Sequence, residues 1–172
     1  MHLFLKIPPT EEPLTLQEVE DYLKLPSNQD EAFVKTLIAA ARSYIENVTG
    51  RALLKQKWEL HITPPYPPSS PLVKRRGKEL EIELPRPPLL HVEAVKAAQK
   101  EVSFTIKDGK VCLPSSFWDQ ELVLTYWAGY GDTALSLPPA LKMASLMAAR
   151  FIYDNQTGEL ALLAPFKVHR LI

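Results

Sequence analysis

The sequence predicts an α+β protein in which helices come first, short antiparallel strands follow, and one more helix closes the chain. Two observations predict this fold class. Residues 31–48 carry apolar side chains at three- and four-residue steps, which is the period of a helix. After Gly50 the period changes to two, and after Pro138 it becomes helical again.

Composition limits the function before any motif is considered. The chain has 172 residues, of which 46% are hydrophobic, so it is long enough to bury one sizeable core. Lys and Arg total 20, as do Asp and Glu, and this balance argues against the bulk positive charge of a nucleic-acid-binding protein. The single cysteine, Cys112, excludes an intramolecular disulfide and is expected to be a buried apolar residue in a reducing cytoplasm. We expect a soluble protein without a signal peptide and without a membrane span.

Two helices are predicted near the start of the chain. The pattern from Thr15 to Glu18 is a capping box, and it starts a short helix that ends at about Leu23. Ser27 and Asn28 offer a cap for the longer helix over residues 31–48. Gly50 is suited to the left-handed position that follows a helix end.

Alternating apolar and polar residues predict a series of short strands. They are residues 56–62, 79–84, 102–106, 111–113 and 121–127. Asp108-Gly109 predicts a hairpin turn between the third and fourth of these strands. The strand at 121–127 is apolar on both faces, so we expect it to be central. The proline-rich residues 64–71 are expected to form a stiff loop outside the sheet.

The last helix is predicted to open at Pro138-Pro139, and its small residues allow another helix to pack closely. We therefore expect residues 1–158 to form a single α+β domain: the N-terminal helices and the C-terminal helix pack as a small bundle with an inserted antiparallel β-sheet at about 56–127. An extended C-terminal arm, residues 159–172, follows.

The arm carries the first group of candidate interaction residues. They are Leu160, Leu162, Leu163, Pro165, Phe166, Lys167, Val168 and Arg170. These side chains could fold back on their own core. We favour docking, because no later element follows to cover the apolar residues, and a proline-broken apolar strip with basic residues suits an extended segment laid into a groove of a partner.

The second group of candidates combines a basic loop with an acidic strand. The basic residues are Lys74, Arg75, Arg76 and Lys78, and the acidic residues are Glu79, Glu81 and Glu83. The basic loop could contact phosphates or the acidic face of a neighbouring subunit, or it could simply be solvated. The glutamates alternate with apolar residues, a pattern typical of a solvated face or an interface rather than of an acid/base pair.

The remaining chemistry-bearing residues predict no catalytic, metal or cofactor site. The four histidines, His2, His61, His91 and His169, have no metal-ligand spacing with one another or with Cys112. Gly129-Tyr-Gly131 lies between a strand and a helix, as a phosphate-binding loop would, but it lacks the third glycine. The sequence therefore predicts a non-enzyme.

A series of landmarks runs along nearly the whole chain. They are Leu14-Thr-Leu-Gln-Glu-Val19, the junction from Ala39-Ala-Ala-Arg-Ser-Tyr-Ile-Glu46 through Thr49-Gly-Arg51 to Gln56-Lys-Trp58, Leu84-Pro-Arg-Pro-Pro88, Thr125-Tyr-Trp-Ala-Gly-Tyr-Gly131, Leu137-Pro-Pro-Ala-Leu-Lys142 and Leu162-Leu-Ala-Pro-Phe-Lys-Val168. In this order they resemble the head-tail connector proteins, also called adaptor or head-completion proteins, of long-tailed bacteriophages and gene transfer agents.

The resemblance implies a structural virion protein at the head-tail interface, made in the bacterial cytoplasm. Such a protein joins the portal protein after DNA packaging, and it forms a ring, as a dodecamer, through which DNA passes without sequence-specific contacts. It then offers a docking surface to the next connector, stopper or tail protein. The arm is implied to reach the portal or adjacent subunits. Ring closure needs two different faces on each subunit, and the basic loop and the acidic row are our candidates.

The main alternative is a DNA-packaging accessory protein that binds nucleic acid through the Lys74–Lys78 loop. A small hydrolase is a more distant alternative. Balanced charge and few exposed aromatic residues argue against the packaging factor.

Overall fold

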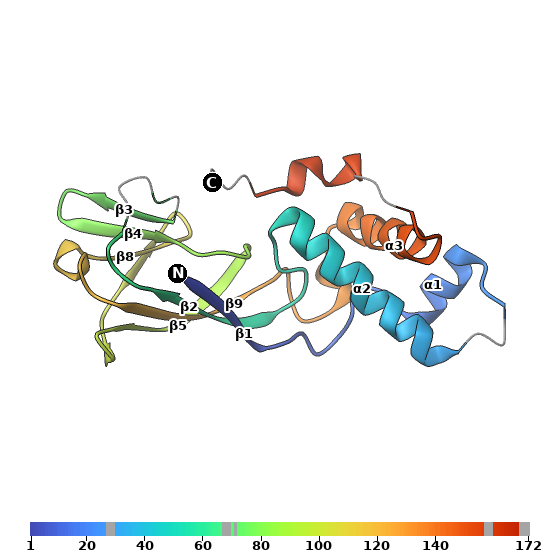
Figure 1. Cartoon of the computed structure of the whole chain (residues 1–172), viewed down its shortest axis with the longest axis horizontal. Helices are drawn as coiled ribbons and strands as arrows, with labels where there is room; N and C mark the ends of the chain where they lie inside the picture. Colours follow the sequence, from blue (N-terminus) through green and yellow to red (C-terminus); the bar gives the residue numbers. More distant parts are fainter. Residues whose placement is uncertain (27–29, 67–69, 71, 157–159, 169–172) are drawn as a thin grey trace. The chain divides into compact units, whose positions relative to one another are not determined.

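The computed structural model describes residues 1–26, 30–66, 70, 72–156 and 160–168. They form two compact units. The helical unit consists of Pro9–Lys55 and Gly129–Val168, and the strand unit contains Met1–Pro8 and Gln56–Ala128 (Figure 1). The predicted α+β fold class, with strands inserted between the helices, is confirmed.

Three helices build the helical unit: α1 (Leu16–Leu23), α2 (Glu31–Thr49) and α3 (Pro139–Tyr153). The predicted capping box is present, because the Thr15 hydroxyl accepts the amide of Glu18 at 3.2 Å and the Glu18 carboxylate accepts the amide of Thr15 at 2.9 Å. The expected cap of the second helix, at residues 27 and 28, lies outside the described residues. Asp30 caps α2 instead, and Gly50 ends it in the left-handed region at φ 72°.

The three helices share one apolar core. Helix α3 contributes Ala144, Ala148 and Ala149, which are fully buried, and these small side chains let α2 pack closely against it. Leu53 and Leu54, just after α2, complete the core. The short helical turns η2 (Ala134–Ser136) and η3 (Ala161–Phe166) flank α3 along the chain.

The first sheet of the strand unit is antiparallel, with strand order β1-β2-β9-β5-β6. Its strands are β1 (His2–Ile7), β2 (Gln56–Ile62), β9 (Leu122–Ala128), β5 (Leu89–Ala97) and β6 (Lys100–Glu101). The prediction that the strand at 121–127 is central is confirmed, since β9 lies between β2 and β5. Strand β1 was not predicted, because its partner lies roughly fifty residues away in the sequence and leaves no local signal.

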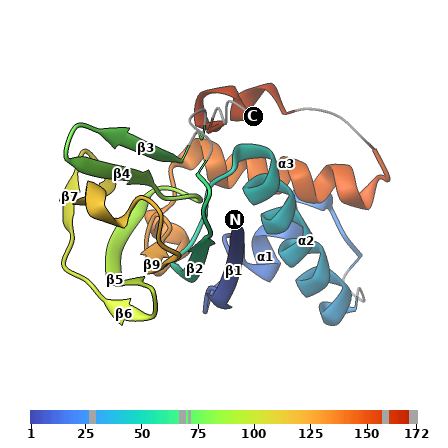
Figure 2. The ribbon, with the colours of Figure 1, turned by 60° about the vertical axis from the view of Figure 1, so that its left-hand side comes forward.

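The second sheet is also antiparallel, with order β3-β4-β8-β7. Figure 2 shows its paired strands β3 and β4 side by side. Its strands are β3 (Val73–Arg76), β4 (Glu79–Glu83), β8 (Lys110–Pro114) and β7 (Thr105–Lys107). The predicted hairpin at Asp108-Gly109 joins β7 to β8, with both residues in the left-handed region. Cys112 is buried, as expected, and burial raises the pKa of its thiol.

Candidate functional site

The basic segment lies in a hairpin rather than in the loop that the sequence predicted. Lys74, Arg75 and Arg76 belong to β3, and Gly77 and Lys78 form the turn into β4. We call Lys74–Lys78 the basic hairpin. All five residues are exposed. The pairing places Lys74 opposite Glu81 and Arg76 opposite Glu79, so the two charged groups of the prediction are neighbours within one chain.

Two of the three glutamates of β4, Glu79 and Glu81, have cationic partners on the neighbouring strands. Glu81 pairs with Arg76 at 3.2 Å and with Lys110 at 3.9 Å. Glu79 pairs with Lys107 at 2.5 Å, and this hydrogen bond raises the pKa of Lys107. The described part of the chain provides no carboxylate partner for Lys74, Arg75 or Lys78, so these three cations of the hairpin are unpaired there, whereas the acidic row is largely neutralised. A contact between the two groups across subunits stays a prediction.

The tail packs on its own helical unit over residues 160–168. Leu160 and Leu163 are buried in the core that α2 and α3 form, and Phe166 packs against that core. The earlier helices cover these two leucines, so the alternative that the tail folds back on its own core holds for Leu160 and Leu163. Leu162 and Pro165 are exposed, and Arg170 lies outside the described residues. Docking of this segment on a partner stays a prediction.

Two hydrogen bonds to main-chain carbonyls connect the end of the tail to the C-terminal end of α2 and the residues after it. The Nε of Arg51 donates to the carbonyl of Phe166 at 2.6 Å, and the amide of Val168 donates to the carbonyl of Thr49 at 2.8 Å. Lys167 and Val168 are half-buried there. The Thr49-Gly-Arg51 landmark therefore has a structural task, which is to hold the tail.

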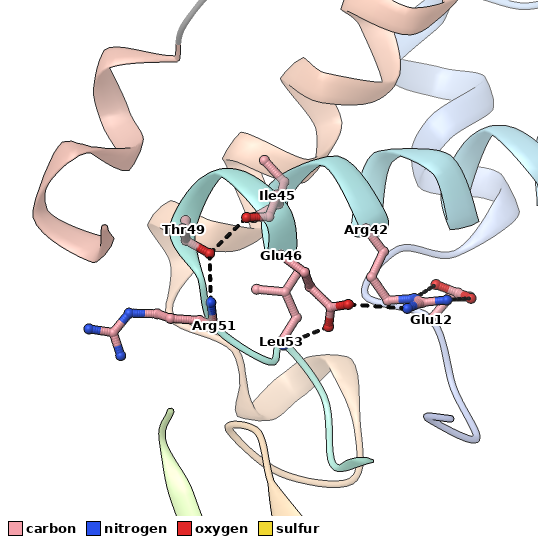
Figure 3. Close-up of polar contacts among 7 residues, drawn as sticks. All are labelled: Glu12, Arg42, Ile45, Glu46, Thr49, Arg51 and Leu53. Carbon is pink, nitrogen blue, oxygen red and sulfur yellow. Dashed lines mark hydrogen bonds and ion pairs between the residues drawn. The ribbon is translucent and has the colours of Figure 1, made fainter. Parts of the chain in front are cut away.

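A buried carboxylate organises the same junction (Figure 3). Glu46 accepts the amide of Leu53 at 2.9 Å and the guanidinium of Arg42 at 3.3 Å. Arg42 in turn binds both carboxylate oxygens of Glu12, at 2.8 and 3.3 Å. Burial lowers the pKa of Arg42, but the hydrogen bonds and charges of Glu12 and Glu46 together outweigh this effect and raise the pKa. The network ties the segment before α1 to the segment after α2.

Thr49 closes the last turn of α2. Its hydroxyl donates to the carbonyl of Ile45 at 2.7 Å and accepts the amide of Arg51 at 3.3 Å. The sequence pattern marks this stretch as a landmark but predicts no role for Arg42, Glu46 or Thr49. The spacing of four residues between Arg42 and Glu46, on one face of a helix, was the signal that could have found the ion pair.

The Gly129-Tyr-Gly131 landmark forms backbone hydrogen bonds with residues 53–55, which follow α2. The amide of Tyr130 donates to the carbonyl of Leu53 at 3.1 Å, and the amide of Lys55 donates to the carbonyl of Gly131 at 2.8 Å. A Cβ at Gly129 would collide with the backbone of Leu54, and its φ of 132° also requires glycine. These glycines allow two chain segments to approach closely, so the tyrosine amide is engaged rather than open to a phosphate.

Two further features are absent from the residues that the structure describes. Within the described ranges, no group of three or more His, Cys, Asp and Glu side chains could hold a metal ion. Among the helices that the structure describes, none has the length and apolar character needed to cross a membrane.

The chain is similar to one protein family and to chains of solved particle structures. The family described as "Head completion protein" matches residues 12–161. A chain of the "Virion of native gene transfer agent (GTA) particle" is 20% identical, with a TM-score of 0.70 over 100% of this chain and 98% of that chain. Chains from the "Neck of native GTA particle computed with C12 symmetry" and the "Neck of empty GTA particle computed with C6 symmetry" are 21% and 19% identical, each with a TM-score of 0.69 and the same coverage. No curated protein matches.

Proposed function

Because this chain belongs to the head completion protein family, we propose that it is a structural head-tail connector of a phage-like particle. In this role it joins the portal protein after DNA packaging and provides the surface on which the next connector, stopper or tail protein docks. The family match over residues 12–161 carries the proposal. The fold shared with chains of gene transfer agent particles, two of them from necks, supports it.

We further infer that the assembled protein is a ring, with twelve copies around the channel. The C12 symmetry named for one structure of the same fold supports this number. A closed ring requires heterologous contacts, in which one face of a subunit meets a different face of its neighbour. DNA would pass through such a ring without sequence-specific contacts.

A structural role also fits the way the protein uses its buried polar groups. Glu46 and Arg42 hold backbone and one another, and Thr49 completes a helix end. Groups engaged in this way stabilise a scaffold, and they are poorly placed to transfer protons to a substrate.

Electron microscopy of the protein mixed with purified portal tests the proposal. We expect rings seated coaxially on one face of the portal, and no such rings when the portal is omitted and the protein is dilute. Portals that stay bare at saturating protein would contradict the connector role.

A DNA-packaging accessory role is the second candidate. The cations of the basic hairpin that have no carboxylate partner within the described residues favour it. Phosphate contacts make binding fall steeply with salt, because each contact releases counterions. A salt titration of duplex DNA binding separates the two functions. We expect weak binding for the connector, whereas tight binding with a steep salt slope would favour the packaging factor.

A further inference from the structure

The five-stranded sheet ends in an apolar edge strand. Strand β1 pairs with β2 on one side only, as far as the described residues extend. Its large side chains are well exposed, with Phe4 at 48%, Leu5 at 44% and Ile7 at 41%. The backbone groups along the outer side of such a strand are available to pair with a strand of another chain.

The edges of the second sheet carry features that discourage pairing. Strand β3 has three consecutive exposed cations, from Lys74 to Arg76. Strand β7 has only three residues, one of which is the ion-paired Lys107. Charges and short length are common means of protecting sheet edges. In β1 the single charged side chain is Lys6, and Glu59 of β2 neutralises it at 3.4 Å.

The opposite edge of the same sheet is open along most of its length. Strand β6 pairs only with Lys96 and Ala97 of β5. Residues 89–94 of β5 therefore have no outer strand among the residues that the structure describes, and Leu90 there is 42% exposed. The charged residue in this stretch, Glu93, pairs with Lys57 at 2.7 Å. Within β1 and residues 89–94 of β5, the two charged side chains, Lys6 and Glu93, are already paired, so joining these stretches would bring no unpaired carboxylate or ammonium group of theirs into the contact.

The directions of the strands suit a contact between copies. Strands β1, β2, β9 and β5 are antiparallel in succession, so the edge strands β1 and β5 run in opposite directions. Consider two copies related by rotation about an axis that runs parallel to the strands. Their sheets then lie side by side, and β5 of one copy meets β1 of the next as an antiparallel pair. This contact is heterologous, as a ring requires.

We propose that β1 of each copy adds to the outer edge of β5 of the neighbouring copy, so that the sheet continues from subunit to subunit. The inference rests on the ring of the proposed function and names one contact between its subunits. Bulges interrupt the register of β1 between Leu5 and Ile7, and that of β5 at two places between Leu89 and Ala94. Bulges bend strands, and a sheet that curves around a channel needs such bends.

Crosslinking of rings assembled on portals tests the contact directly. The probe is the double variant Leu5→Cys with Leu90→Cys in a Cys112→Ala background, treated with a short bismaleimide. We expect a ladder of covalent multimers on a denaturing gel, and monomers from each single variant. Dimers from Leu5→Cys alone would show that β1 pairs with β1 of a second copy. That result, or rings whose double variant stays monomeric on the gel, would overturn the proposal.

A matched pair of charge substitutions gives an independent readout. Phe4 on β1 and Ile106 on β7 are equally exposed, at 48% and 49%. We expect Phe4→Lys to reduce ring formation about tenfold while Ile106→Lys leaves it unchanged, because a charge on an edge strand opposes strand pairing. Thermal melting shows whether each variant is folded.

Amide hydrogen exchange of the unchanged protein adds a backbone measurement, and exchange of residues 2–7 should slow when rings form.

The outcomes separate this proposal from the proposed function. Normal rings with Phe4→Lys, or unchanged exchange of residues 2–7 in rings of the natural sequence, would refute the β1–β5 contact and leave the connector role standing. Natural protein that forms no ring on portals would refute both.

Discussion

At the end of α2 the carboxylate of Glu46 serves two groups from different parts of the chain. It accepts the amide of Leu53, which is fully buried, and it pairs with Arg42. A buried amide without an acceptor costs more than an average hydrogen bond contributes, because the group has also lost its water. We therefore expect Glu46 to stabilise the junction after α2 more than its position in an amphipathic helix indicates.

Replacing Glu46 should destabilise the protein measurably. We expect Glu46→Ala to lower the free energy of unfolding by about 1–3 kcal/mol, since it leaves the Leu53 amide and one side of Arg42 unpaired. Glu46→Gln keeps an acceptor for the amide and should cost less. Urea denaturation measures both values.

Glu31→Ala is the control for this series. Glu31 lies on the same helix and forms an exposed ion pair with Lys35 at 2.6 Å. Exposed pairs contribute little, so the control should change stability by no more than about 0.5 kcal/mol. Equal losses for Glu46→Ala and Glu31→Ala would refute the structural role of the network.

At the scale of elements, the tail shows that an apolar segment after the last long helix can still belong to the core. Leu163 is fully buried, whereas Leu162 beside it is 37% exposed. The sequence has two leucines in a row, and the turn of η3 decides which one points inward. The buried side chain contributes to the core, and docking of the exposed one on a partner stays a prediction.

The two leucines make a matched test of folding against docking. We expect Leu163→Ala to lower the free energy of unfolding by about 2–5 kcal/mol, as other core leucines do when shortened. Leu162→Ala should leave stability nearly unchanged and weaken co-sedimentation with portal, if the arm docks there. Removing residues 160–172 should lower the melting temperature. A truncated protein that melts like the natural one would show that the tail adds nothing to the core.

At the scale of the whole molecule, charge is balanced in sum but uneven in place. The net charge is zero, yet the basic hairpin holds Lys74, Arg75 and Lys78 without carboxylate partners among the described residues. A local cluster of this kind contacts phosphates or an acidic protein surface, and total charge does not distinguish between them.

Charge reversal at the hairpin distinguishes the two functions. For a connector, Lys74→Glu with Arg75→Glu should impair ring assembly and leave DNA binding as weak as in the control, Lys24→Glu with Lys35→Glu, which changes net charge equally at two exposed residues of the helical unit. For a packaging factor, the hairpin variant alone should lower the salt slope of DNA binding, by about one for each phosphate that the variant no longer binds. Electron microscopy and a salt titration supply the two measurements.

The sequence by itself determined the elements whose causes are local. The capping box at Thr15, the left-handed Gly50, the Asp108-Gly109 turn and the central strand at 121–127 each depend on neighbouring residues, and each is confirmed. The ordered landmarks also indicated the family, which the match over residues 12–161 confirms.

Only the tertiary structure decided the contacts between residues that are distant in the sequence. These are the pairing of β1 with β2, the division of the strands into two sheets, the burial of Leu163 and the bond from Arg51 to Phe166. Periodicity reports which face of an element is apolar, but it does not report what covers that face. In the tail, packing on the helical core buries Leu163 and leaves Leu162 exposed. In the basic hairpin, the ion pair of Arg76 with Glu81 leaves Lys74, Arg75 and Lys78 without a carboxylate partner among the described residues.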